Sequence, residues 1–180
     1  MKKLIFILCG VLLLFTSCIS IPRIPDGYEQ IESRPTMYER FDEFQNVTWI
    51  FNEQMFSNKN STVYIGKTKD KIWMRIKFIY SGSDWIFFEN ATFVNQQGKR
   101  LSFKFNSWDK KTEVKDGYVK ESIDILISDS EIQNLLELYE GTNVRLRLSG
   151  EKYKEYEIND MDFVQGIKET INFYFSQKNK

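Results

Sequence analysis

The chain contains no histidine among its 180 residues. This absence excludes Ser-His-Asp triads, Cys-His dyads, histidine-ligated zinc and an imidazole pH switch. Basic and acidic side chains balance at 25 each, so the chain lacks the broad positive field that nucleic-acid binding requires. We therefore expect no nucleic-acid partner and none of the commonest hydrolase mechanisms. The sequence also indicates no cofactor and no metal site.

Cysteine and proline are scarce and are confined to the N-terminal part. The two cysteines are Cys9 and Cys18, and all three prolines lie between residues 19 and 36. Because no cysteine follows position 18, the rest of the chain cannot form an internal disulfide bond. Aromatic residues, by contrast, make up 16% of the chain and hydrophobic residues 42%, which is enough apolar area for a folded core.

The first 18 residues have the pattern of an export signal. Two lysines precede a twelve-residue run, 4–15, that is apolar apart from one glycine. This length is typical of a secretory signal core, whereas a membrane-spanning helix needs about 18 to 20 apolar residues. The run leads into Phe15-Thr16-Ser17-Cys18.

Small residues directly before a cysteine resemble the lipobox of bacterial lipoproteins, whose signal peptide is removed just before a cysteine that receives a diacylglyceryl thioether. Thr16 and Ser17 match the small positions, while Phe15 stands where the family usually has Leu, Val or Ile. The resemblance implies a signal peptide over 1–17, lipidation of Cys18, and attachment in the bacterial cell envelope facing the periplasm or the cell surface. An ordinary cleaved signal peptide with an incidental cysteine, or an uncleaved anchor, is the alternative.

Residues 18–36 are expected to be a proline-containing tether between the lipidated cysteine and the folded part. Proline without hydrophobic periodicity is typical of a semi-extended linker with a reach of about 3 Å per residue. The alternative is that part of this segment packs as an edge strand, because Ile21, Ile24, Tyr28 and Ile31 are apolar. Residues 37–180 contain no proline and no break in composition, so we expect one domain there.

Alternation with a period of two dominates this domain. Segments 72–80, 101–105, 123–127 and 144–148 each place apolar side chains on one face and mainly polar ones on the other, which is typical of half-buried strands. Residues 85–88 form a continuous apolar run, which predicts a strand covered on both faces. Short turn sequences between the segments favour antiparallel neighbours.

Two segments have helical spacing instead. Residues 128–131 form a capping box, and an apolar stripe follows as far as Gly141, where a C-terminal cap is expected. A second stripe extends from about Asp160 to Ser176. The expected fold is therefore mainly β: an antiparallel β-sandwich or meander with two helices in the C-terminal part. A single antiparallel sheet covered by helices is the alternative.

Tryptophan and neighbouring cations supply the candidate ligand-binding residues. Trp73, Arg75 and Lys77 share one face of the strand 72–80, where the ring could stack on an anionic glycan or phosphorylated headgroup and the cations could pair with it. Alternatively, the C-terminal helix covers Trp73 while the two cations reach past it to water. Trp108 lies in a polar stretch and is the second candidate, as the tryptophan most expected to be exposed.

The leading hypothesis is a membrane-anchored, non-enzymatic binding or structural module whose partner is an envelope protein, a glycan or a lipid. The stretch from Arg75 to Phe88 resembles the β-rich ectodomains of uncharacterised bacterial lipoproteins. The alternative is a histidine-free hydrolase of envelope polysaccharide, in which two carboxylates about 5 to 9 Å apart would cleave the glycosidic bond. Such an enzyme needs two carboxylates converging in a pocket, whereas a binding module needs an exposed aromatic or apolar patch.

Overall fold

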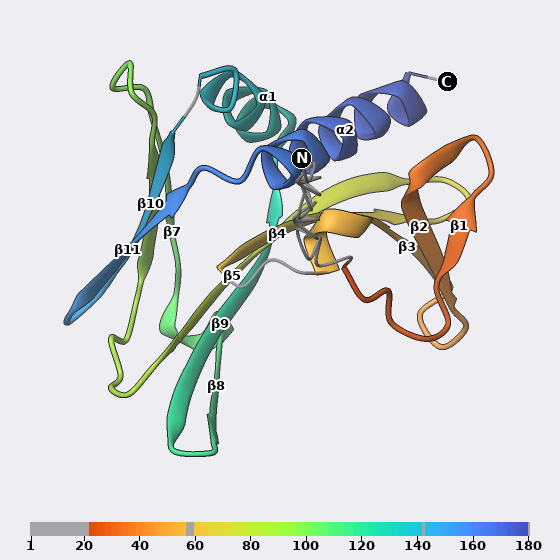
Figure 1. Cartoon of the computed structure of the whole chain (residues 1–180). Coiled ribbons are helices and arrows are strands. Elements are labelled where there is room, and N and C mark those ends of the chain that lie inside the picture. The colour runs from red at the N-terminus through yellow and green to blue at the C-terminus, as the bar shows by residue number, and fades with distance from the viewer. Residues whose placement is uncertain (1–21, 57–59, 142, 180) are drawn as a thin grey trace, which may run out of the picture.

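The computed structural model describes residues 22–56, 60–141 and 143–179. In this part of the chain, eleven strands form two antiparallel sheets, and the two α-helices lie in the C-terminal part (Figure 1). The larger sheet has the strand order β1-β2-β3-β4-β5-β9-β8, and the smaller has the order β11-β10-β6-β7. The mainly β fold with two C-terminal helices is therefore confirmed, and it has two sheets in place of the single sheet of the alternative.

The chain passes back and forth between the two sheets. After β1 to β5 it crosses to the smaller sheet for the hairpin β6–β7, returns for β8 and β9, and then adds β10 and β11 to the smaller sheet. The larger sheet comprises β1 (Glu29–Ile31), β2 (Arg34–Asp42), β3 (Val47–Asn52), β4 (Ser61–Lys67), β5 (Ile72–Gly82), β8 (Lys110–Lys115) and β9 (Tyr118–Ile127). The smaller comprises β6 (Asn90–Val94), β7 (Arg100–Lys104), β10 (Val144–Ser149) and β11 (Tyr153–Ile158).

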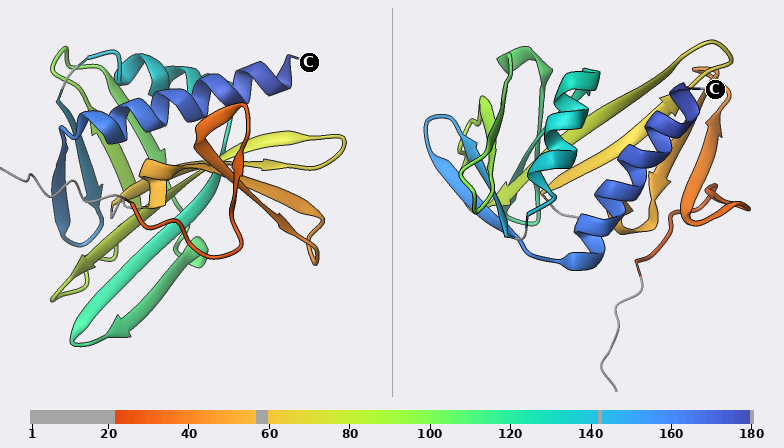
Figure 2. Two further views of the ribbon diagram at one scale, coloured as in Figure 1. Left: turned by 45° about the vertical axis from the view of Figure 1, so that its right-hand side comes forward. Right: turned by 90° about the horizontal axis from the view of Figure 1, so that it is seen from above.

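The helical elements are α1 (Asp129–Leu138) and α2 (Met161–Lys178), with short 3-10 helices η1 (Glu53–Phe56) and η2 (Ser107–Asp109). Helix α2 packs on β3, β4 and β5 of the larger sheet, α1 packs on β7 of the smaller sheet, and the two helices contact each other (Figure 2). The sheets also meet directly, because the ring centroid of Phe78 on β5 lies 5.8 Å from that of Phe93 and 5.6 Å from that of Phe103. One hydrophobic core thus joins both sheets and both helices.

Both helices begin where the sequence predicts. The side chain of Ser128 accepts a hydrogen bond from the backbone N–H of Glu131 in a complete capping box, and Asp160 caps α2. Helix α1 ends at Leu138 with Tyr139 as its cap, so the cap expected at Gly141 is wrong. Within the described segments, no helix has both the length and the apolar character that crossing a membrane requires.

The folded part starts before residue 37, so the predicted tether over 18–36 is wrong for its second half. β1 pairs with β2, which already begins at Arg34. The ring of Tyr28 also packs edge-on against Phe56 at 5.0 Å. Backbone pairing and apolar burial together offset the conformational entropy that these residues lose on ordering. The alternative, that part of this segment packs as an edge strand, is therefore the one that holds for these residues. The predicted signal peptide 1–17 and Cys18 lie outside the described residues.

The strand predicted over 85–88 is also wrong, because this segment is an irregular link between β5 and β6. Glu121 on β9 is fully buried, and its carboxylate accepts hydrogen bonds from the backbone N–H groups of residues 86, 87 and 88 at 2.7, 2.9 and 3.0 Å. These donors would otherwise need a neighbouring strand. The Glu121 side chain thus takes the place of the backbone hydrogen bonds to a neighbouring strand that the apolar run alone would predict.

Candidate functional site

The face of the larger sheet that points away from α2, called the aromatic face below, carries the residues singled out in the sequence. Along β5, Met74, Ile76 and Phe78 are buried in the core that α2 shares. Because side chains alternate along a strand, Trp73 and Arg75 project from the opposite face. Helix α2 therefore does not cover Trp73, and the alternative in which the C-terminal helix covers this ring is wrong.

Seven rings form a continuous row across the aromatic face. Their centroids lie 4.7 to 6.4 Å apart from ring to ring, and the closest pair, Phe51 and Tyr64, stacks with an interplanar angle of 7°. Such contacts stabilise a sheet surface beyond the area they bury, by about 0.5 to 1.5 kcal/mol per pair. The row consists of Tyr28, Tyr38, Trp49, Phe51, Phe56, Tyr64 and Trp73.

The two ends of this row differ. At one end Tyr28 and Phe56 pack over Phe51. At the other end Trp49 and Trp73 border an open hollow of about 730 Å³, called the tryptophan hollow below. Val47 and Leu126 add apolar surface to it, and its polar lining residues are Gln45, Asp70, Lys71, Arg75 and, from the end of α2, Lys178.

The two indoles meet edge to face, with centroids 6.0 Å apart and an interplanar angle of 88°. Trp73 lies directly over Gly66 on the neighbouring strand: a Cβ at position 66 would come within 2.6 Å of the indole Nε1. Glycine at this position therefore lets the ring lie flat on β4. Leu126 beside it is 60% exposed, so apolar surface faces solvent here.

Arg75 does not reach past the tryptophan to water, because it is held by β9. Its Nε donates to the carboxylate of Asp124 at 2.8 Å, and its Nη2 donates to the Asp124 backbone oxygen at 2.9 Å. The hydroxyl of Tyr64 donates to the same carboxylate at 2.5 Å. Burial, followed by the hydrogen bond to Asp124 and its charge, raises the pKa of Tyr64 well above its ordinary value. The charge of Arg75 is thus compensated by Asp124, and its side chain is held in place at the edge of the hollow.

The other two sequence candidates lie elsewhere. Lys77 is on the aromatic face, in register with Thr62 and Asp124, but it does not line the tryptophan hollow. Trp108 lies in η2 and is 93% exposed, as its polar surroundings predict, and it too lies outside the hollow. The structure therefore brings together Trp73 and Arg75 and adds Trp49, which the sequence reasoning missed. The alternation of Val47, Trp49 and Phe51 was the available signal.

Most carboxylates that line hollows of the described surface lie apart from one another. Four such hollows are lined by one carboxylate each, namely Asp70, Glu140, Glu155 and Glu157. Glu155 and Glu157 line two adjoining hollows, but Glu155 is ion-paired with Arg147. The hydrolase alternative needs two in the same pocket. In the described ranges, no three residues of the types Asp, Glu, Cys and His are grouped to hold a metal ion.

Comparison with known proteins found no matching family model, no matching curated protein and no matching solved structure. The fold and the site together define a two-sheet β domain with an open, tryptophan-lined hollow on the aromatic face of its larger sheet.

Proposed function

We propose that this protein is a membrane-anchored lipoprotein of the bacterial cell envelope whose folded domain binds a glycan. The sequence Phe15-Thr16-Ser17-Cys18 after an apolar signal core supports the anchor. Acyl chains on one cysteine contribute about 0.8 kcal/mol per buried methylene, so two or three chains hold a domain at the membrane surface. The domain then needs no membrane-binding face of its own.

The tryptophan hollow carries the proposal about the ligand. Two partly exposed indoles at right angles offer a ring face and a ring edge, and planar polar side chains line the same hollow. Ligand sites are typically of this kind, mainly apolar with a few polar groups that fix orientation. A sugar ring has apolar C–H faces for the indoles and hydroxyls for Gln45 and Asp70. Asp124 compensates the charge of Arg75, and Asp129 pairs with Lys178. The remaining charges of the lining, on Lys71 and Asp70, are opposite, so this geometry favours a neutral sugar over the anionic glycan expected from the sequence.

Titration of the full chain with tri-N-acetylglucosamine, followed by tryptophan fluorescence, tests the ligand. Replacing Trp73 by alanine removes half of the indole pair, and we expect binding to weaken at least tenfold. Trp108→Ala removes an equally large but distant ring and serves as the matched control, with unchanged affinity. Equal losses in both variants, or none in Trp73→Ala, would place the glycan outside this hollow.

The anchor is tested separately at Cys18. Diacylglyceryl transfer requires a thiol, so Cys18→Ser should leave an uncleaved or soluble form in place of the lipidated one. Detergent-phase partitioning and the mass of the mature chain report the difference. The proposal of a lipid anchor would be withdrawn if the variant partitioned and matured like the wild type.

A further inference from the structure

The outer face of the smaller sheet differs in chemistry from the aromatic face of the larger one. Along β6, β7 and β10, apolar residues alternate inward and polar residues outward. The outward positions of these strands are Asn90, Thr92, Val94, Arg100, Ser102, Lys104, Arg145, Arg147 and Ser149. Four of the nine are cations. The outward positions of the fourth strand, β11, are Tyr153, Glu155 and Glu157, so cations outnumber carboxylates four to two on this face. This surface is called the arginine face below.

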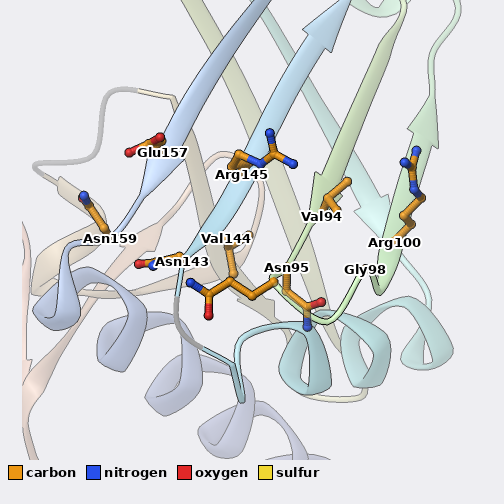
Figure 3. A pocket seen from close by; sticks show the side chains of 10 residues that line it. Val94, Asn95, Gly98, Arg100, Asn143, Val144, Arg145, Glu157 and Asn159 are labelled. Atoms are coloured by element: carbon orange, nitrogen blue, oxygen red, sulfur yellow. The ribbon is translucent and has the colours of Figure 1, made fainter.

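Two of these arginines flank a single valine. Val94 on β6 is in register with Arg100 on β7 and with Arg145 on β10. Neighbouring strands lie about 4.8 Å apart, so the Cα atoms of the two arginines are about 10 Å apart and both side chains can reach the space above Val94. Figure 3 shows the two side chains on either side of this valine.

Neither of these guanidinium groups has an ion-pair partner among the described residues. Arg147, one pair further along β10, differs: its Nε donates to the carboxylate of Glu155 at 2.7 Å. Arg100 and Arg145 are both exposed, so no burial requires a partner within the protein. Their positive charge is therefore available to an external anion.

A hollow of about 550 Å³ lies over this pair, and Asn143, Asn159 and Glu157 also line it. A second hollow of about 230 Å³ continues along the same face beside Thr92 and Ser149, and Val94 and both arginines line the two hollows in common. The combined space exceeds what a bare inorganic anion fills. Amide and hydroxyl groups around the cations suit a ligand that carries hydroxyls.

We propose that Arg100 and Arg145 bind the phosphate group of a sugar phosphate. Each guanidinium presents a fork of parallel N–H donors, and two forks that approach from opposite sides need acceptor oxygens pointing in different directions. A tetrahedral phosphate has three such oxygens and a charge of about −1.5 to −2 at neutral pH. The site is on the other sheet and does not depend on the tryptophan hollow.

Glu157 offers a way to test whether this site binds a negatively charged ligand. It is in register with Arg145 across β10 and β11 and lines the same hollow. Its carboxylate competes with a phosphate for Arg145 and repels the incoming negative charge. Glu157→Gln keeps the size of the side chain and removes the charge, so it should tighten phosphate binding about threefold or more.

The test is an NMR titration of the full chain in a non-ionic detergent, with glucose 1-phosphate as the probe and ionic strength held constant. The backbone amides of residues 94, 100 and 145 should shift and saturate. The double variant Arg100→Gln/Arg145→Gln should lose at least tenfold in affinity. Lys104→Gln removes an exposed cation from the same face but outside both hollows, so this variant should bind within twofold of the wild type.

Four outcomes would overturn the proposal. The first is binding by the double variant at wild-type affinity while its thermal unfolding also matches the wild type. The second is glucose 1-phosphate binding no tighter than acetate. The third is no binding of the sugar phosphate, and co-sedimentation on phosphatidylglycerol vesicles would then assign the face to a membrane surface. The fourth is equal weakening in Lys104→Gln and the double variant, which would indicate non-specific charge attraction.

Discussion

At the scale of single residues, the buried carboxylate of Glu121 determines how the chain crosses between the sheets. It accepts three backbone hydrogen bonds from residues 86–88, and the Nζ of Lys110, only 9% exposed, lies 3.5 Å from it. Three donors and one cation thus depend on one side chain. Losing it leaves the buried N–H groups of Ile86 and Phe88 without their acceptor and Lys110 without its ion-pair partner.

We therefore expect Glu121→Ala to lower the free energy of unfolding by about 3 to 5 kcal/mol, the range for breaking a buried charged pair. Denaturant unfolding of the full chain measures the change. Glu113→Ala, which removes an exposed carboxylate from neighbouring β8, is the control and should stay within about 0.5 kcal/mol of the wild type. Similar values for the two variants would mean that the three backbone hydrogen bonds contribute little.

The sequence contains a signal for Glu121 but not for the partner of Arg75. Alternation puts Glu121 on the same face as Ile123, so its inward direction follows from the pattern already used for this strand. Arg75 and Asp124 are 49 residues apart, and they meet only because β5 pairs with β9. No local pattern encodes that pairing. The sequence alone therefore could not predict that Asp124 compensates the charge of Arg75 beside the tryptophan hollow.

At the scale of elements, helix α2 was predictable because its apolar stripe has a period that only a helix satisfies. What the stripe packs against is a tertiary property: α2 lies on the inner face of β3, β4 and β5. Its buried residues include Phe163, Ile167, Ile171, Phe173 and Tyr174. A close approach also fixes its position, because a Cβ on Gly166 would come within 2.7 Å of Asn52 Oδ1.

Ile171, fully buried in α2, tests whether this helix is part of the cooperative fold. Ile171→Ala should lower the free energy of unfolding by about 2 to 5 kcal/mol, because it leaves a cavity between helix and sheet. The adjacent Asn172→Ala changes an exposed position on the same helix and should have almost no effect. Thermal unfolding of both variants is the measurement. A near-wild-type Ile171→Ala would mean that α2 is docked loosely and is free to bind a partner.

Strand positions followed from alternation, but the division into two sheets did not. The segments 72–80, 101–105, 123–127 and 144–148 all lie in strands, within a few residues of the predicted limits. Short turns correctly indicated antiparallel neighbours within hairpins. The β6–β7 hairpin nevertheless belongs to another sheet than β5 and β8, since the irregular segment 85–88 redirects the chain. Which hairpins share a sheet depends on contacts of this kind, which lie outside any local pattern.

At the scale of the whole molecule, the two sheets bury one face each in a common core and present two chemically different outer faces. The aromatic face ends in the tryptophan hollow, while the arginine face carries unpaired cations. A glycan bearing neutral rings and phosphate groups would have complementary chemistry on both sides of the domain. Variants on the two faces should then weaken binding of simple probes independently, because no residue lines both hollows.

The stability of the molecule should fall at alkaline pH. With no histidine, no side chain with an ordinary pKa titrates between pH 6 and 8, so a plateau is expected there. Burial raises the pKa of Tyr156 to about 12, and the pKa of fully buried Tyr139 is raised further. Above pH 10 the unfolded chain loses these phenol protons while the folded chain keeps them. Stability is therefore lost as the pH rises, by about 1.4 kcal/mol per pH unit for each tyrosine that stays protonated.

Tyr139→Phe separates this effect from general alkaline unfolding. The Tyr139 ring packs 6.2 Å from Phe93, and its hydroxyl is buried with no hydrogen-bond partner among the described residues. Burying an unpaired hydroxyl costs about 1 to 3 kcal/mol, so phenylalanine should raise the free energy of unfolding at pH 7 by about 1 kcal/mol. It also removes one of the titrating phenols, so the decline between pH 10 and 11 should become shallower by up to about 1.4 kcal/mol. Denaturant unfolding at pH 7, 10 and 11 measures both effects. A destabilised Tyr139→Phe with an unchanged alkaline slope would show that the hydroxyl is paired and that its proton is lost equally easily in both states.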